Sequence, residues 1–121
     1  MLKEAMKALR VTDLEYASDI TRLLKAAELD LKTSGVIIDG EIDITITETE
    51  DQQTGEVTIT VTDESDIEDD AIITALITFA MARGSYAGRE DREQLEKSYQ
   101  AQMKKLANTT GYTNFGEEAG T

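Results

Sequence analysis

The sequence predicts an α+β fold: a small, mostly helical bundle of three to four helices, with one antiparallel β-hairpin inserted between the second and third helices. Apolar residues recur every three or four positions before residue 35 and after residue 70, which is typical of helices packed on a core. Between about residues 41 and 63 the period changes to two, and β-branched residues dominate. With 121 residues, the chain suffices for one domain. We expect that domain over residues 1–110 and a flexible C-terminal tail over 111–121.

Two helices are predicted before the hairpin. Residues 2–9 place Leu2, Met6 and Leu9 on one face. Thr12 and Glu15 have the spacing of a capping box, which predicts a second helix that runs to about residue 33. Gly35 favours its end, because glycine readily adopts the left-handed conformation common at helix C-termini. The stripe expected to face the core comprises Tyr16, Ile20, Leu23, Leu24, Ala27 and Leu31.

The predicted hairpin has one aliphatic face and one threonine face. Ile42, Ile44 and Ile46 alternate with polar residues, and a second alternating run spans residues 57–62. The polar loop 48–56 separates the two strands. A lone two-stranded hairpin is marginal in water, so either the helices or a neighbouring subunit should cover the aliphatic face.

Two further helices are predicted after the hairpin. Ser65 and Glu68 repeat the capping-box spacing before a helix that reaches Arg83. That helix is apolar almost all round, which indicates a central position in the fold. A last helix over about 89–108 should turn Leu95, Tyr99, Met103 and Leu106 inward.

The formal charge of −13 resides in one middle segment. Residues 39–70 contain thirteen acidic residues and no lysine or arginine, whereas the rest of the chain has twelve acidic and twelve basic residues. Such a surface repels a phosphate backbone and disfavours ordinary nucleic-acid binding.

The composition excludes several functional classes. The chain has no cysteine and no histidine, so thiolate or imidazole metal sites and the common nucleophile–base pairs are absent. The acidic residues do not match a calcium-binding loop, and no glycine-rich phosphate loop occurs. No apolar run is long enough to span a bilayer, and the N-terminus does not resemble a signal peptide. We therefore expect a protein made in the cytoplasm, without enzymatic activity, cofactor, metal or membrane association.

Two groups of residues leave alternatives open. Arg83, Arg89 and Arg92 either pair with nearby acidic residues (Glu90, Asp91 and Glu93) or contact an acidic partner or a neighbouring subunit. Tyr112 and Phe115, in a polar tail, either fold back on the domain or anchor a partner.

Three segments together resemble the head–tail connector family of long-tailed phages and prophages. They are ITRLLKAAELDLKTSGV, DIEDDAIITALITFAMARGSYAG and REQLEKSYQAQMKKLANTTGY. The features that match the family pattern are Ala26, Ala27, Asp30, Leu31 and Gly35, then Gly84 with Tyr86, the pair Ser98 and Tyr99, and finally Tyr112. The resemblance covers roughly residues 1–112. Residues 82–84 depart from it, because many relatives are more aromatic before the glycine.

The resemblance implies a structural protein of the virion, located at the head–tail junction. In that family a ring, commonly of twelve copies, docks beneath the portal protein, extends the DNA channel and carries the stopper or tail-completion protein. If the acidic segment lines this channel, we expect DNA to pass through without specific binding, because phosphates gain nothing from carboxylates. Mutual repulsion of the acidic segments would oppose assembly, so we expect a monomer in isolation at low salt, with the portal as the template.

The resemblance and the charge pattern together give three sets of candidate residues. The candidate portal or partner interface comprises Tyr99, Lys104, Lys105, Tyr112 and Phe115. The candidate acidic segment facing the channel or its rim comprises Glu48, Glu50, Asp51, Glu56, Asp63 and Glu64. The candidate contacts between subunits are Thr45, Thr47, Thr58, Thr60, Arg83, Arg89 and Arg92.

Three other functions remain as alternatives. The chain could be a stopper or tail-completion subunit of the same junction. It could also be an acidic DNA mimic that inhibits a DNA-binding enzyme, or a small cytoplasmic interaction module. Portal, capsid and tail genes beside its own gene would argue against the last of these.

Overall fold

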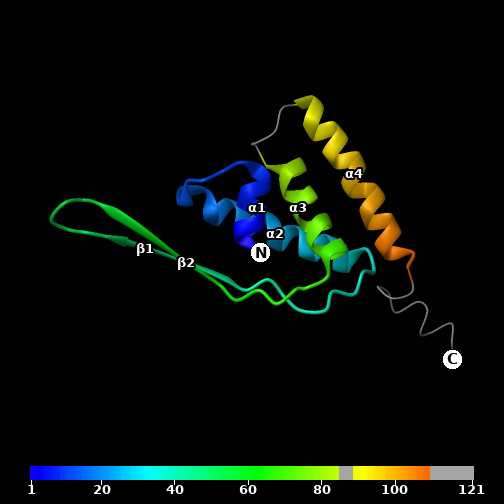
Figure 1. The fold of residues 1–121 in the computed structure, drawn as a ribbon, viewed down its shortest axis with the longest axis horizontal. Helices are drawn as coiled ribbons and strands as arrows, with labels where there is room; N and C mark the ends of the chain where they lie inside the picture. Colours follow the sequence, from blue (N-terminus) through cyan, green and yellow to red (C-terminus); the bar gives the residue numbers. More distant parts are fainter. Residues whose placement is uncertain (85–88, 110–121) are drawn as a thin grey trace.

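The computed structural model describes residues 1–84 and 89–109, and the chain order of its elements confirms the predicted α+β class (Figure 1). One antiparallel two-stranded sheet lies between the second and third of four α-helices. The expected tail, 111–121, lies outside the described residues. The elements are α1 (Leu2–Leu9), the 3-10 helix η1 (Leu14–Tyr16), α2 (Ala17–Thr33), β1 (Ile44–Glu50), β2 (Val57–Asp63), α3 (Asp70–Arg83) and α4 (Arg89–Ala107).

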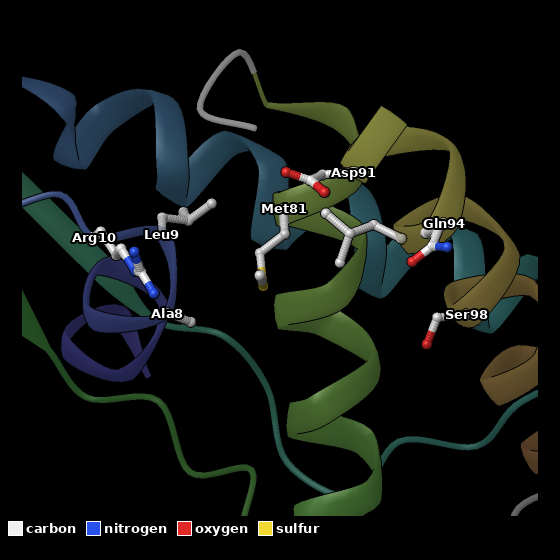
Figure 2. A pocket seen from close by; sticks show the side chains of 8 residues that line it. Ala8, Leu9, Arg10, Met81, Asp91, Gln94 and Ser98 are labelled. Atoms are coloured by element: carbon white, nitrogen blue, oxygen red, sulfur yellow. The ribbon is translucent and has the colours of Figure 1, made fainter. Parts of the chain in front are cut away.

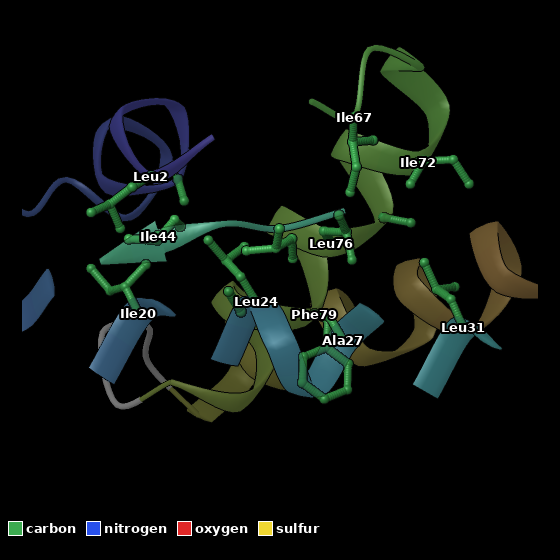
Figure 3. Close-up of a cluster of buried hydrophobic side chains, with 14 of the residues drawn as sticks. Leu2, Ile20, Leu24, Ala27, Leu31, Ile44, Ile67, Ile72, Leu76 and Phe79 are labelled. Carbon is green, nitrogen blue, oxygen red and sulfur yellow. The ribbon is translucent and has the colours of Figure 1, made fainter. Parts of the chain in front are cut away.

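Helix α3 is the central helix, as its lack of a polar face predicts. It packs against α1, α2 and α4. Ile72, Leu76 and Phe79 of α3 are buried in one apolar cluster with residues of α1, α2 and β1 (Figure 3). Leu2 of α1 and Leu24 of α2 belong to the same cluster, so one core joins the helices to the base of the hairpin.

Helix α4 turns its predicted face toward α3. Tyr99 and Leu106 are buried, whereas Leu95 and Met103 are half-buried. The prediction for Tyr16 is wrong: it precedes α2, and its side chain is exposed. The other five residues of the predicted α2 stripe are buried or half-buried.

Both predicted capping boxes are wrong. The side chain of Asp13 accepts the N–H of Glu15 at 2.9 Å and starts η1, and α2 begins only at Ala17. The side chain of Asp69 accepts the N–H of Ala71 at 2.9 Å and starts α3. In each case an aspartate close to the predicted cap takes the role, because its short carboxylate is as good an N-cap as serine or threonine.

The hairpin register separates the two predicted faces. The threonine face consists of three directly opposed pairs: Thr45 with Thr62, Thr47 with Thr60, and Thr49 with Thr58. The opposite face pairs Ile46 with Val61, but toward the loop it pairs Glu48 with Ile59 and Glu50 with Val57.

The helices cover only the base of the aliphatic face. Ile44 is 7 % exposed, whereas Val57 is 54 % exposed. The two strands extend away from the helical body as a long ribbon (Figure 1).

Candidate functional site

The ribbon of residues 44–63, which we call the arm, is the most distinctive surface of the molecule. It contains five acidic residues and no basic residue. Its exposed side chains include Glu48, Glu50, Asp51 and Glu56, from the candidate acidic segment. All four lie toward the loop end of the arm, beyond the part that the helices cover.

A neck of paired backbone, formed by residues 40–43 and 64–66, joins the arm to the body. The N–H of Glu64 donates to the carbonyl of Asp43 at 2.7 Å, and the N–H of Asp66 donates to the carbonyl of Glu41 at 3.2 Å. The carboxylate of Asp66 accepts the N–H of Glu41 at 2.7 Å, and the Ser65 hydroxyl oxygen accepts the N–H of Asp43 at 2.9 Å. With these two side chains as acceptors, hydrogen-bonded pairing continues from the two strands into the neck.

Helix α2 also holds the neck. The carboxylate of Glu28 accepts the N–H of Ile42 at 3.1 Å, and the Ile42 side chain is 7 % exposed. The arm is therefore fixed at its root by hydrogen bonds and by apolar burial.

Asp63, a candidate for the segment facing the channel or its rim, is bound to the helical body. Its carboxylate accepts the N–H of Leu2 at 2.7 Å and lies 3.1 Å from the amine of Met1, and the side chain is only 21 % exposed. Burial alone would raise the pKa of Asp63. Hydrogen bonds from Leu2 and Ser65, together with the Met1 amine, outweigh burial and lower this pKa to about 2. Asp63 therefore fastens the arm to α1.

Several acidic residues of the 39–70 segment thus have structural roles. Asp51, Asp63, Asp66 and Asp69 all accept backbone N–H groups, at the tip of the arm, at its base, in the neck and at the start of α3, respectively. Short aspartate side chains are suited to such local bonds. The glutamates Glu48, Glu50, Glu56 and Glu64 have exposed side chains and are the better candidates for contact with a partner.

An open groove, which we call the arm groove, separates the arm from η1. It is lined by Thr12, Asp13, Leu14, Glu15, Glu48, Val57 and Ile59. Its apolar lining residues are Leu14, Val57 and Ile59, of which Leu14 is 42 % and Val57 54 % exposed, and its three charged residues are all acidic. Leu14 could not be recognised as a site residue from the sequence, because only the fold brings it opposite the arm.

The lysines of α4 form an exposed basic surface, which we call the lysine face: Lys97, Lys104 and Lys105. From Lys97 to Thr109 the chain has three lysines and no acidic residue. No ion pair joins these lysines to another residue within 1–84 and 89–109.

The prediction of Tyr99 as an interface residue is wrong, because its side chain is 0 % exposed and its hydroxyl donates to Asp30. Lys104 and Lys105 are exposed, as an interface requires. Tyr112 and Phe115 lie outside the described residues.

Arg83 bridges α3 and α4. Its Nε and Nη2 donate to the two carboxylate oxygens of Glu96, each at 2.9 Å, and its guanidinium lies 4.8 Å from the centre of the Phe79 ring. The predicted partners were Glu90, Asp91 and Glu93, whereas the actual one lies farther along α4. Hydrogen bonding from Arg83 lowers the pKa of Glu96. Arg92 is exposed, and the side chain of Arg89 is not described.

A second groove lies between the end of α1, α3 and the first half of α4 (Figure 2). Met81 of α3 lines it, and two residues contribute opposite charges: Arg10, directly after α1, and Asp91 of α4. The hydroxyl of Ser98 also lines this groove, but it cannot be paired with a histidine base, because the chain contains no histidine.

The threonines proposed as subunit contacts lie together on the exposed face of the arm. Thr45, Thr47, Thr58 and Thr60 all have exposed side chains. Their role between subunits remains a prediction.

Two kinds of feature are absent from residues 1–84 and 89–109. No helix in these ranges is long and apolar enough to cross a bilayer. No group of three or more acidic side chains there is placed to hold a metal ion.

Comparisons of the chain with protein-family models, with curated proteins and with solved structures find no match.

Proposed function

We propose that this chain is a structural subunit of a phage head–tail connector ring, located beneath the portal, where it extends the DNA channel. The observation that carries the proposal is the arm: a ribbon with five acidic residues and no basic residue that projects from a helical body. The order of motifs that resembles the connector family supports the same role.

The physical argument concerns what an acidic arm does beside DNA. Carboxylates offer the phosphate backbone neither counter-charge nor hydrogen-bond donors, so DNA gains no binding energy at such a surface. A ring of arms with Glu50 and Glu56 toward the bore would guide the DNA without retaining it. Fixation of the neck by Asp66, Ser65 and Glu28 would keep each arm at a defined angle.

The test is made in the phage that encodes the chain. Glu50→Lys and Glu56→Lys together place positive charge at the arm tip and leave Asp51, which accepts the N–H of Gln53 at 2.8 Å, in place. We expect virions with normal connector occupancy but with slow or incomplete DNA ejection, because lysines bind the passing phosphates. Occupancy is measured by mass spectrometry of purified virions, and ejection by dye uptake of released DNA.

The matched control is Asp91→Lys with Glu93→Lys, which makes the same charge change on exposed positions of α4. This variant should eject DNA at the normal rate. Normal ejection by the arm variant would refute the assignment of the arm tip to the channel. Absence of the wild-type chain from virions, together with no binding to the portal protein, would refute the connector function itself.

A further inference from the structure

We propose that the arm groove of one copy receives the lysine face of α4 from the next copy, so that the subunits associate head to tail. This inference rests on the proposed ring function and specifies its contact between subunits. It also reassigns Lys104 and Lys105 from the portal to a neighbouring subunit.

Charge complementarity identifies the occupant. Asp13, Glu15 and Glu48 are the charged residues that line the arm groove, and the arm beside it has no basic residue. The second half of α4, from Lys97 to Ala107, has the opposite character, with three lysines and no acidic residue. Opposite potentials of this kind select the partner and fix its orientation.

The apolar surfaces fit together as well. Lys97, Ala101 and Lys104 are exposed and lie at positions i, i+4 and i+7, so they share one face of α4. Ala101 between the lysines lets the helix approach Leu14 and Val57 closely. The aliphatic stems of the lysines can cover Leu14 and Val57 while their ammonium groups reach the carboxylates that line the groove.

The contact cannot form within one chain. The arm and α4 lie at opposite ends of the long axis of the molecule (Figure 1). A contact between two different surfaces leaves both surfaces available on every copy, so association continues until the ring closes. A connector ring needs this kind of contact.

Cross-linking tests the contact directly, because the chain has no cysteine and every thiol can be placed by design. Val57→Cys is mixed with Ala101→Cys, bound to the portal and treated with a short bismaleimide. On the portal we expect Val57–Ala101 cross-links in excess of Val57–Val57 and Ala101–Ala101 products, and in the chain alone at low salt, where we expect a monomer, a lower yield. Lys3→Cys, on the exposed face of α1, replaces Ala101→Cys as the control and should react with Val57→Cys only at background level.

Charge reversal then tests whether opposite charges cause this contact. Glu15→Lys with Glu48→Lys in the Val57→Cys copy should reduce the Val57–Ala101 product by about tenfold or more, because like charges then meet. Adding Lys97→Glu and Lys104→Glu to the Ala101→Cys copy should restore it. Lys3→Glu with Lys7→Glu, the same charge change on α1, should not.

The outcomes separate this inference from the proposed function. If rings form on the portal while Val57–Ala101 cross-links stay at background, or if the paired reversal fails to restore them, the inference is refuted and the connector function stands. If the Val57–Ala101 product forms but the chain neither binds the portal nor enters virions, the contact stands and the connector function is refuted.

Discussion

The hydroxyl of Tyr99 in α4 donates a hydrogen bond to the carboxylate of Asp30 in α2, and this bond connects two helices that flank α3. The Tyr99 side chain is 0 % exposed, and its ring meets Phe79 edge-on, with centroids 5.1 Å apart. The bond satisfies both a buried hydroxyl and a partly buried carboxylate.

Tyr99→Phe should lower the free energy of unfolding by about 1–2 kcal/mol, because it leaves the carboxylate of Asp30 without this donor. Urea denaturation at neutral pH measures the difference. A change below a few tenths of a kcal/mol would show that water replaces the hydroxyl without loss.

The same variant isolates the ionisation of Tyr99. Burial, followed by the hydrogen bond to Asp30, raises the pKa of Tyr99 well above its usual range. The folded state therefore favours the neutral phenol, and this contribution to stability is complete below the unfolded pKa of about 10 and is lost as the pH rises toward the folded pKa. The absorbance titration of the wild type minus that of Tyr99→Phe should show a phenol that ionises only when the protein unfolds in alkali.

Asp63→Asn should loosen the arm at its base. The carboxylate of Asp63 has its pKa lowered to about 2, so it contributes stability above the unfolded value of 3.8 and loses it as the pH falls toward 2. Allowing for solvent screening, we expect a loss of about 1–2 kcal/mol at pH 6. The wild type and the variant should converge near pH 2, and a difference in unfolding free energy that is independent of pH would contradict this role.

Gly40 should be the more sensitive of two glycines with positive φ. At Gly40, with φ +97°, an added Cβ would lie 2.8 Å from the backbone carbonyl oxygen of Asp66, so the neck would have to open. Gly35, with φ +94°, has open space around the same position. Gly35→Ala should therefore cost about 1 kcal/mol from backbone strain alone. Gly40→Ala should cost clearly more, with increased amide hydrogen exchange at Glu41 and Asp43.

Arg83→Lys should weaken the link between α3 and α4 only slightly. Lysine keeps the charge but cannot make the two parallel bonds to Glu96. Because both side chains are partly exposed, we expect a loss of about 0.5–1 kcal/mol, which high salt should reduce. A double-mutant cycle with Glu96→Gln measures the coupling, and a value near zero would show that packing alone joins the two helices.

The periodicity of the sequence was sufficient to predict the four helices and the hairpin in their order, but not where each element begins and ends. Period two placed five of the six threonines on one face of the hairpin, and the absence of a polar face placed α3 at the centre. The sixth, Thr49, was predicted in the loop 48–56, but β1 continues to Glu50 and pairs Thr49 with Thr58. The two helix starts failed because capping depends on the geometry of a single turn, and in a chain this rich in acidic residues several candidates have suitable spacing.

The candidate site was also predictable only in part from the sequence. Counting residues is enough to show that the middle of the chain carries the negative charge. It cannot show which carboxylates are available to a partner, because Asp63 and Asp66, whose carboxylates bind backbone N–H groups, have the same side chain as any exposed aspartate. Tyr99 was misassigned for a similar reason: a tyrosine with a buried acceptor and one at an interface look alike in sequence.

The sequence by itself therefore determined the helices, the hairpin and the segment that holds the charge, since these depend on local period and composition. Only the tertiary structure decided that Leu14 lies opposite Val57, that Asp63 reaches Leu2 and that the arm and the lysine face lie at opposite ends of the molecule. Those relationships join residues distant in the chain, and packing of the whole core fixes them, which no local pattern records.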